Sequence, residues 1–268
     1  MRWVADEVRP IGELFDVSGK TALVTGGGRG IGLMIARGLV EAGVRVVVAS
    51  RKAGDLEAAA AELRAFGECE AIPADLSTPE GAHALAEAVR TAVPTLNILV
   101  NNSGATWGAP LEEFPASGWD RVIHTNLEGV FHLTTRLLPV LRAAAGAEDP
   151  ARVINIGSID GLRVPLAENY SYSASKAAVH MLTRHLAKRL AGEHITVNAI
   201  APGPFDSKMM AFMLDTPEKR AQVERTVPLG RIGRPADAAG LTLFLASRAG
   251  SYVTGAVIPL DGGITGCG

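Results

Sequence analysis

The sequence is poor in cysteine, in aromatic residues and in any excess of positive charge. Its 2 cysteines in 268 residues are too few for a disulfide framework or a cysteine-rich zinc site, and they suit a reducing compartment such as the cytoplasm. The balance of 26 basic against 28 acidic residues argues against a nucleic-acid partner, because such binding draws on clustered cations. A hydrophobic content of 47% excludes a disordered chain.

Targeting, membrane and metal signals are also missing from the sequence. No stretch approaches the roughly 18 uninterrupted apolar residues that a membrane-spanning helix requires. Residues 1–17 are acidic and lack an apolar run, so we expect a short arm rather than a signal peptide. The six histidines show no i, i+4 pair of the kind that binds zinc on a helix, so no metal is expected.

Short apolar runs alternate with longer stretches of helical period along residues 18–268. We predict strands at 21–25, 45–49, 70–73, 96–100, 152–156, 196–200 and 256–260. Predicted helices span 30–43, 54–66, 79–92, 119–145, 172–191 and 235–247, with an irregular helical excursion at 206–226. Continuously apolar strands indicate burial on both faces, and strand–helix alternation indicates a parallel sheet. The sequence therefore predicts one doubly wound, Rossmann-type α/β domain with a seven-stranded parallel sheet.

Glycine is abundant, with 30 residues, and five of them lie in one turn. The segment 25–32, TGGGRGIG, joins the first predicted strand to the first predicted helix. Free N–H groups and the partial positive charge at a helix N-terminus favour a phosphate there. A plain glycine turn is the alternative, but the position between strand and helix favours a dinucleotide. The residues expected to bind it are Gly26, Gly28, Arg29, Gly30, Ile31 and Gly32.

The end of the second predicted strand indicates which dinucleotide binds. An NAD site needs a carboxylate there for the ribose hydroxyls, but the chain reads Ala49-Ser50-Arg51. Arg51 and Arg29 are suited to flank a 2′-phosphate, and Ser50 adds a hydroxyl. Each arginine alone is more simply a solvated surface charge. Together, and without an acid, they predict that NADP(H) is preferred over NAD(H).

A tyrosine and a lysine lie four residues apart at the start of a predicted helix, in Tyr172-Ser-Ala-Ser-Lys176. This spacing places both side chains on one helix face. An ammonium group near a phenol favours the phenolate, so we expect Lys176 to lower the pKa of Tyr172. Such a phenol can exchange a proton with a carbonyl oxygen. An amphipathic surface helix is the alternative for this pair considered alone.

Further polar residues follow the ends of predicted strands. Ser158 follows the fifth strand, where a hydroxyl could bond the same carbonyl oxygen, and the amide-rich turn 101–104 follows the fourth. Asn126 falls inside a predicted helix, where asparagine is mildly unfavourable. Asn126 is either a satisfied core residue or a polar group of an active site.

These motifs, in this order, resemble the classical short-chain dehydrogenase/reductase family over residues 18–263. The resemblance implies a catalytic tetrad of Asn126, Ser158, Tyr172 and Lys176. Tyr172 is implied as the acid/base and Ser158 as the group that positions the substrate carbonyl. Lys176 is implied to bind the nicotinamide ribose and tune Tyr172, and Asn126 to hold a water in a proton relay.

The resemblance also extends the predicted cofactor site. It places Asp75 and Leu76 beside the adenine, and Phe205 and Ser207 at the nicotinamide carboxamide. The other cofactor-binding residues it implies are Asn102, Ser103, Gly104, Tyr172, Lys176, Pro202 and Gly203. Two residues depart from the family pattern: Ser103 replaces an alanine, and Ser207 replaces a threonine.

The substrate is predicted from the variable segment that follows Pro202. Its apolar residues suit a lid, about 204–230, over an aliphatic chain, although helix packing or a subunit contact is the alternative. The expected pocket residues are Trp107, Pro165, Met209, Met210 and Met213. Segments 151–158, 192–195 and 198–203 resemble NADPH-dependent 3-oxoacyl reductases of the rhamnolipid-synthesis type, which implies reduction of a 3-oxoacyl thioester. Another ketone or alcohol is the alternative, and a non-catalytic NADP(H) sensor a remoter one; the family implies a homotetramer or dimer.

Overall fold

The computed structural model describes residues 10–267, whose seven strands form one parallel sheet. The order across the sheet is β3-β2-β1-β4-β5-β6-β7. The chain therefore builds outward from β1 to β3, then returns to β4 and builds toward the other side. This confirms the predicted doubly wound sheet, whose cleft lies where the order reverses. The strands are β1 (Thr21–Thr25), β2 (Arg45–Ser50), β3 (Cys69–Pro73), β4 (Ile98–Asn101), β5 (Ala151–Ile156), β6 (Ile195–Pro202) and β7 (Val257–Leu260).

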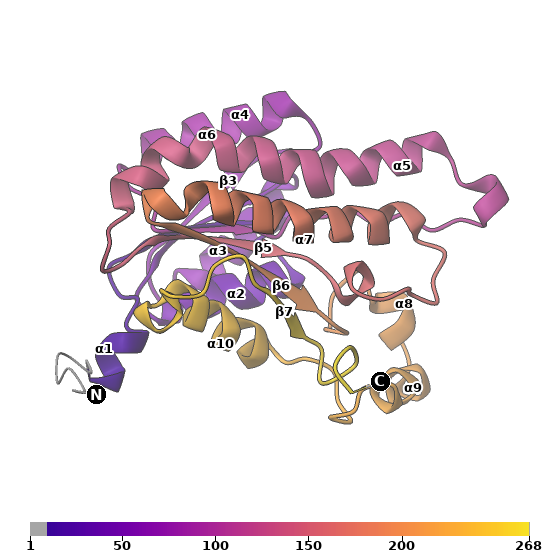
Figure 1. The fold of residues 1–268 in the computed structure, drawn as a ribbon. Coiled ribbons are helices and arrows are strands. Elements are labelled where there is room, and N and C mark those ends of the chain that lie inside the picture. The colour runs from indigo at the N-terminus through magenta and orange to yellow at the C-terminus, as the bar shows by residue number, and fades with distance from the viewer. Residues whose placement is uncertain (1–9, 268) are drawn as a thin grey trace.

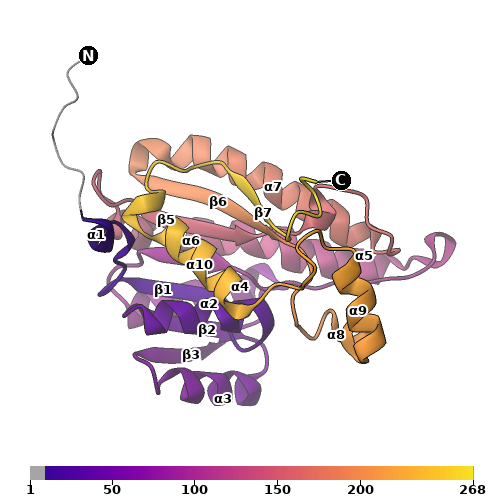
Figure 2. The same cartoon turned by 90° about the horizontal axis from the view of Figure 1, so that it is seen from below.

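Helices cover both faces of the sheet, as Figures 1 and 2 show. The longer helices are α2 (Gly30–Glu41), α3 (Ala53–Leu63), α4 (Pro79–Ala92), α6 (Gly129–Ala144), α7 (Tyr170–Leu190) and α10 (Pro235–Ala246). The shorter ones are α1 (Ile11–Phe15), α5 (Ala116–Ile123), α8 (Ala211–Leu214) and α9 (Pro217–Arg225). Helices α2, α3 and α10 pack on one face, and α4, α6 and α7 pack on the other.

Successive strand residues are buried against opposite helix layers. In β1, Ala22 and Val24 join the core beneath α2, α3 and α10, whereas Leu23 between them joins the core beneath α4, α6 and α7. In β2, Val47 faces the second core while Val46 faces the first. A strand with both faces buried needs apolar residues at every position, which is why these runs do not alternate with polar residues.

The long helix predicted at 119–145 is interrupted in the structure. Helix α5 ends at Ile123, a π-helical turn (η2) spans His124–Glu128, and α6 begins at Gly129. A π turn contains one more residue than an α turn, so it rotates the side chains that follow it. The turn carries Asn126, whose side chain is buried and hydrogen-bonded. The pattern of apolar residues does not show this turn, whose buried polar side chain is bonded to a distant part of the chain.

The segment between β6 and α10 leaves the sheet and returns to it. It contains α8 and α9, and its two ends meet in an isolated parallel bridge between Phe205 and Gly233. At the lateral edges of the sheet, β3 ends in Pro73 and β7 contains Pro259. Across residues 10–267, no helix is both long enough and apolar enough to span a membrane.

Candidate active site

The predicted site residues gather where the strands of the sheet end. Thr25 is the last residue of β1, Ser50 the last of β2 and Asn101 the last of β4. Ile156 and Pro202 end β5 and β6. Because all the strands are parallel, these ends share one side of the sheet, and the loops that follow them form a common rim.

The glycine-rich turn leaves β1 in a conformation that favours glycine. Gly26 has φ +66° and Gly30 has φ +53°, both in the left-handed region. A Cβ on Gly32 would collide with Gly26 O and with the Asn102 side chain. No side chain caps the first turn of α2, which begins at Gly30, so its N–H groups remain available to an anion.

The turn after β4 supports the glycine-rich turn. Asn102 Nδ2 donates to Thr25 O at 2.9 Å and to Gly26 O at 3.3 Å. The Thr25 hydroxyl accepts the main-chain N–H groups of Asn102 and Ser103 at 2.9 and 3.0 Å. The side chain of Asn102 is thus committed to the loop, and a cofactor would meet the main chain of this turn. The sequence prediction included Thr25 in the glycine-rich segment but not among the binding residues.

The residues predicted to select the cofactor lie at the end of β2 and beside it. Ser50 Oγ lies 3.5 Å from the position that a Cβ on Gly28 would occupy, so its hydroxyl faces the glycine-rich turn. Arg29 and Arg51 are exposed, and neither forms a salt bridge within residues 10–267. Two unpaired guanidinium groups and no carboxylate at this position fit a 2′-phosphorylated dinucleotide.

The predicted adenine-side residues lie in the loop after β3. Leu76 is buried, whereas Asp75 is exposed and accepts the Ser77 N–H at its Oδ1 at 3.0 Å. This bond fixes the carboxylate in a local turn. The main chain is also crowded here, because a Cβ on Gly129 would touch Leu76 O.

Asn126 is buried and makes three hydrogen bonds with its side chain. Its Oδ1 accepts the Ala105 N–H at 2.7 Å, and its Nδ2 donates to Ala105 O and to Ser175 Oγ at 2.9 Å each. The amide therefore ties the loop after β4 to α7. All of its donors are used, so the side chain has no free N–H with which to bind a water. Sequence reasoning missed Ser175, although it lies between Tyr172 and Lys176.

Ser158 and Tyr172 face one another across the rim. Ser158 is buried, and its Oγ accepts the Asp160 N–H at 3.1 Å. Burial raises the pKa of Tyr172 to about 12; a hydrogen bond with Ser158 acts to lower it, and the negative charge of Asp160 acts to raise it. The predicted lowering of this pKa by Lys176 is wrong for this structure. The phenol remains protonated at neutral pH.

The hydrogen bond of the Lys176 amine bears on why the pKa of Tyr172 is not lowered as predicted. The side chain is 5% exposed, and its Nζ donates to Ile156 O at 2.7 Å. The Nζ lies 5.6 Å from the centre of the Tyr172 ring. Burial lowers the pKa of Lys176 to about 8. No carboxylate among residues 10–267 pairs with this amine, so near neutral pH it lies close to its own titration point.

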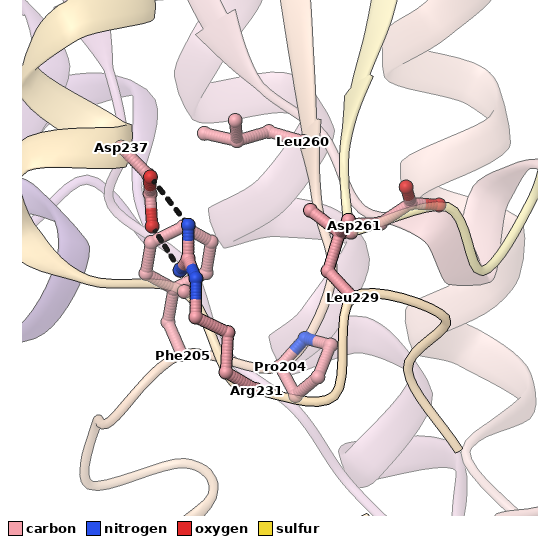
Figure 3. Close-up of a pocket in the computed structure, with 9 residues that line it drawn as sticks. Pro204, Phe205, Leu229, Arg231, Asp237, Leu260 and Asp261 are labelled. Carbon is pink, nitrogen blue, oxygen red and sulfur yellow. Dashed lines mark hydrogen bonds and ion pairs between the residues drawn. The ribbon is translucent and has the colours of Figure 1, made fainter. Parts of the chain in front are cut away.

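The two residues predicted at the nicotinamide carboxamide, Phe205 and Ser207, lie in different surroundings in the structure. Ser207 approaches the glycine-rich turn, since its Cβ lies 3.3 Å from the position of a Cβ on Gly30. Phe205 instead buries its ring against Gly233, in a small pocket of about 80 Å³ beneath the lid (Figure 3). The same pocket contains Arg231, whose guanidinium pairs with both Asp237 oxygens at 2.6 and 3.0 Å. Any cofactor contact from Phe205 would therefore come from its main chain.

The residues predicted to line the substrate pocket are only partly brought together. Trp107 packs against Gly118 at the start of α5, where a Cβ would lie 2.6 Å from the indole. Met209 and Met213 are exposed by 40% and 39% in and beside α8, and Met210 is half-buried. Pro165 is half-buried in the loop between β5 and α7. The lid and this loop both carry apolar side chains with no partner in the core.

Comparison with known proteins agrees with this architecture. A family profile described as Enoyl-(Acyl carrier protein) reductase matches residues 26–265. The rhamnolipids biosynthesis 3-oxoacyl-[acyl-carrier-protein] reductase of Pseudomonas aeruginosa is 51% identical over 249 residues, which cover 93% of this chain and 97% of that protein. The 3beta-hydroxysteroid dehydrogenase 1 of Eggerthella lenta is 37% identical over 254 residues, covering 93% of this chain and 95% of its own length.

A solved structure gives the same result in three dimensions. The Pseudomonas aeruginosa RhlG/NADP active-site complex superposes with a TM-score of 0.92 at 50% sequence identity. The match covers 94% of this chain and 99% of that one. The chain therefore shares both sequence and fold with that protein over nearly its whole length.

Proposed function

The chain belongs to the short-chain dehydrogenase/reductase family, and we propose that it is an NADPH-dependent reductase of 3-oxoacyl thioesters. The observation that carries the chemistry is that Ser158, Tyr172 and Lys176 lie together at one rim of the sheet. Lys176 is buried there and has no carboxylate partner among the described residues. The residues present fit the cofactor, because the rim also contains an uncapped helix N-terminus and two unpaired arginines.

The proposed reaction adds two electrons and two hydrogens to a ketone. Bound NADPH supplies the hydride that adds to carbon 3 of the acyl chain. Tyr172 Oη gives its proton to the carbonyl oxygen, so the C=O double bond becomes a C–OH single bond. A phenol with a pKa of about 12 is protonated at neutral pH and suits the donor role. Ser158 Oγ orients the same carbonyl oxygen.

The remaining tetrad residues support this transfer. The Lys176 ammonium is suited to bind the ribose hydroxyls of the nicotinamide half and to return a proton toward Tyr172. Its pKa of about 8 makes that exchange easy near neutral pH. Asn126 holds the rim together, because its amide binds Ala105 and Ser175. A relay water at Asn126 could bind the main chain or donate to Oδ1, which has a second lone pair, but it could not accept a bond from the side-chain N–H groups, which are occupied.

Replacing Tyr172 with phenylalanine tests the assignment. The Tyr172→Phe variant is expected to lose turnover by at least about 1000-fold and to bind NADPH as the wild type does. Tyr170→Phe is a matched control, because the Tyr170 hydroxyl bonds only the exposed Glu168 and its i+4 residue is Ala174. NADPH oxidation with an acetoacetyl thioester measures turnover, and fluorescence titration measures binding. A Tyr172→Phe variant with near-normal turnover would refute the role.

The cofactor preference rests on the guanidinium groups of Arg29 and Arg51. We expect a clear preference for NADPH over NADH, measured as the ratio of kcat/KM values. The relative solved with NADP supports this choice. In the variant Arg51→Glu the preference should fall or reverse, because a carboxylate repels the 2′-phosphate and accepts bonds from the 2′-hydroxyl. A wild-type preference for NADH would contradict the proposal.

The acyl substrate is supported by the Pseudomonas relative and by apolar side chains near the cleft. Val164, Leu166 and Phe212 are 90%, 105% and 67% exposed on the loop after β5 and on the lid. The second candidate is a cyclic ketone such as a steroid, because the Eggerthella relative is named for one. A panel of acetoacetyl and longer 3-oxoacyl thioesters against cyclic ketones separates the two, and turnover of cyclic ketones alone would overturn the first.

We also propose that copies of the chain assemble into a homotetramer, as the family resemblance implies. Trp119, Phe131 and Met181 leave 43%, 43% and 61% of their surface exposed on α5, α6 and α7. Light scattering after size exclusion measures the mass, and a monomer would contradict the proposal. A cytoplasmic location is proposed on the same resemblance, and cell fractionation tests it.

A further inference from the structure

The face of α7 that carries Tyr172 and Lys176 continues to His180, four residues beyond the lysine. The side chain of His180 is 3% exposed. Neither its Nδ1 nor its Nε2 has a hydrogen-bond partner among the described residues. Buried imidazole nitrogens are usually paired, so hydrogen bonding does not explain why a histidine occupies this place.

The ring of His180 lies against the two glycines that flank the Ser158 turn. A Cβ on Gly161 would lie 2.9 Å from His180 Cε1, and one on Gly157 would overlap His180 Nε2. The main chain can pass the ring only because both positions lack a side chain. The imidazole thus fills the space between Gly157 and Gly161, beside the place where Gly161 meets the main chain of α7.

The turn is also held by main-chain bonds. The Gly157 N–H donates to Ile200 O of β6 at 2.7 Å, and the Gly161 N–H donates to Ser158 O at 3.0 Å. The bond to β6 and the contact with the His180 ring both act on Gly157, the residue directly before Ser158. The position of Ser158 relative to Tyr172 is therefore sensitive to the size of the ring.

We propose that His180 is a positioning residue that acts by its shape and holds the Ser158 turn at working distance from Tyr172. This inference rests on the proposed function, because His180 affects turnover only through those two residues. The ring is neutral at working pH: burial lowers the pKa of His180 to about 4, and the charges of Lys176 and Arg184 add to this. The Gly161 main chain acts to raise this pKa, although neither ring nitrogen meets the distance and angle of a hydrogen bond.

A size series at position 180 tests whether shape carries the effect. His180→Ala removes the ring, and a shift of the turn by about 1 Å is expected to lower kcat roughly 100-fold with an acetoacetyl thioester. His180→Leu restores a similar volume without a nitrogen, so its kcat is expected within about threefold of wild type. NADPH affinity should not change in either variant. If Leu is as impaired as Ala, the ring nitrogens are needed and the proposal fails.

A double-substitution cycle with Ser158→Ala tests whether His180 acts through the serine. Once the hydroxyl is absent, His180→Ala should lower kcat no further, because there is no Ser158 hydroxyl left to position. Independent, multiplying losses would show a merely structural role and would overturn the proposal.

Gly157→Ala tests the same contact from the opposite side, and it covers the case in which His180→Ala folds poorly. In the wild type the new methyl group meets the ring, and kcat should fall. In the His180→Ala background the methyl group occupies vacated space, and kcat should partly recover. An equal loss in both backgrounds contradicts the proposal. If Tyr172→Phe and Ser158→Ala retain turnover, the proposed function fails instead of this inference.

Discussion

Two buried lysines lie at opposite ends of the sheet, and they differ in whether an acid is near. Lys20 precedes β1 and is 9% exposed, and Lys176 lies at the carboxyl ends of the strands and is 5% exposed. Lys20 Nζ contacts both carboxylate oxygens of Asp149 at 2.7 Å and Ala246 O at 3.3 Å. Lys176 Nζ bonds a single main-chain carbonyl.

Asp149, at the end of the sheet where the strands begin, pairs with a second buried cation. Arg152 is 1% exposed, and its Nη2 donates to Asp149 at 3.1 Å and to Ser247 O at 2.8 Å. Its Nε donates to Leu245 O at 3.1 Å. Two buried cations therefore meet the last carbonyls of α10, where the helix dipole is negative. This cluster fastens α10 to the ends of β1 and β5.

Burial lowers the pKa of both lysines, so burial does not distinguish them. For Lys20 the hydrogen bond and charge of Asp149 oppose the effect of burial. For Lys176 nothing opposes it, and its pKa falls to about 8. A buried lysine paired with an acid is a structural tie, whereas one without an acid can change protonation or bind a ligand.

The largest expected effect comes from replacing the acid-free lysine. In Lys176→Met, kcat/KM with an acetoacetyl thioester should fall at least about 1000-fold. The free energy of unfolding without cofactor should not decrease, because an apolar side chain replaces an unpaired buried charge. Steady-state kinetics and urea unfolding measure the two quantities. A Lys176→Met variant that loses stability but retains activity would show that Lys176 is a structural residue, as Lys20 is.

Asp149→Asn should produce the opposite pattern. Without the carboxylate, Lys20 and Arg152 remain buried as uncompensated charges, and stability should fall by about 3 kcal/mol. Turnover per folded molecule should be unchanged, since this end of the sheet lies away from the rim. Urea unfolding followed by circular dichroism gives the change. Normal stability with impaired turnover would show that the two ends are coupled.

The pH dependence of stability should separate the two lysines further. Lys176 has a pKa of about 8 in the folded protein, against 10.5 for an ordinary lysine, so the folded state binds fewer protons between these pH values. Stability from this group therefore rises with pH, by about 2 kcal/mol between pH 7.5 and 9.5. Lys176→Met should remove most of that rise, and Lys20→Met should remove less of it, because Asp149 opposes the lowering of the Lys20 pKa. An unchanged slope in Lys176→Met would contradict the assigned pKa.

The smallest effect is expected for an ion pair on the surface. Arg90 and Glu87 pair at 2.7 Å on α4, with side chains 42% and 51% exposed. Glu87→Gln should change the free energy of unfolding by less than about 0.5 kcal/mol and leave turnover unaltered. The same denaturation assay provides this baseline. A larger loss would mean that surface pairs contribute as much here as the buried cluster does.

The sequence predicted those features that depend on neighbouring residues. The seven strands follow from apolar runs, and the shared helix face of Tyr172 and Lys176 follows from their spacing of four. The glycine-rich turn was visible because its residues are consecutive. In each case the physical cause acts within one element or one turn, so local pattern is sufficient.

Features with distant causes could not be predicted. Lys20 and Asp149 are separated by 129 positions, and the sequence around either residue does not indicate that the two pair. The π turn contains Asn126, whose bonds to Ala105 and Ser175 join parts of the chain that only the fold brings near. The predicted direction of the pKa shift of Tyr172 was wrong because the spacing shows that Lys176 is near, but not that its amine bonds Ile156 O and that the phenol is buried.

The prolines at the two lateral edges of the sheet limit what can add to it. Ala199 N–H bonds Ala256 O and Gly203 N–H bonds Leu260 O, so alternate residues of β7 face β6 and Pro259 faces outward. The same alternation turns Pro73 of β3 outward. Each edge thus lacks an N–H that an incoming strand would need. Pairing of a further strand along either edge would be incomplete at that position, which disfavours edge-to-edge aggregation.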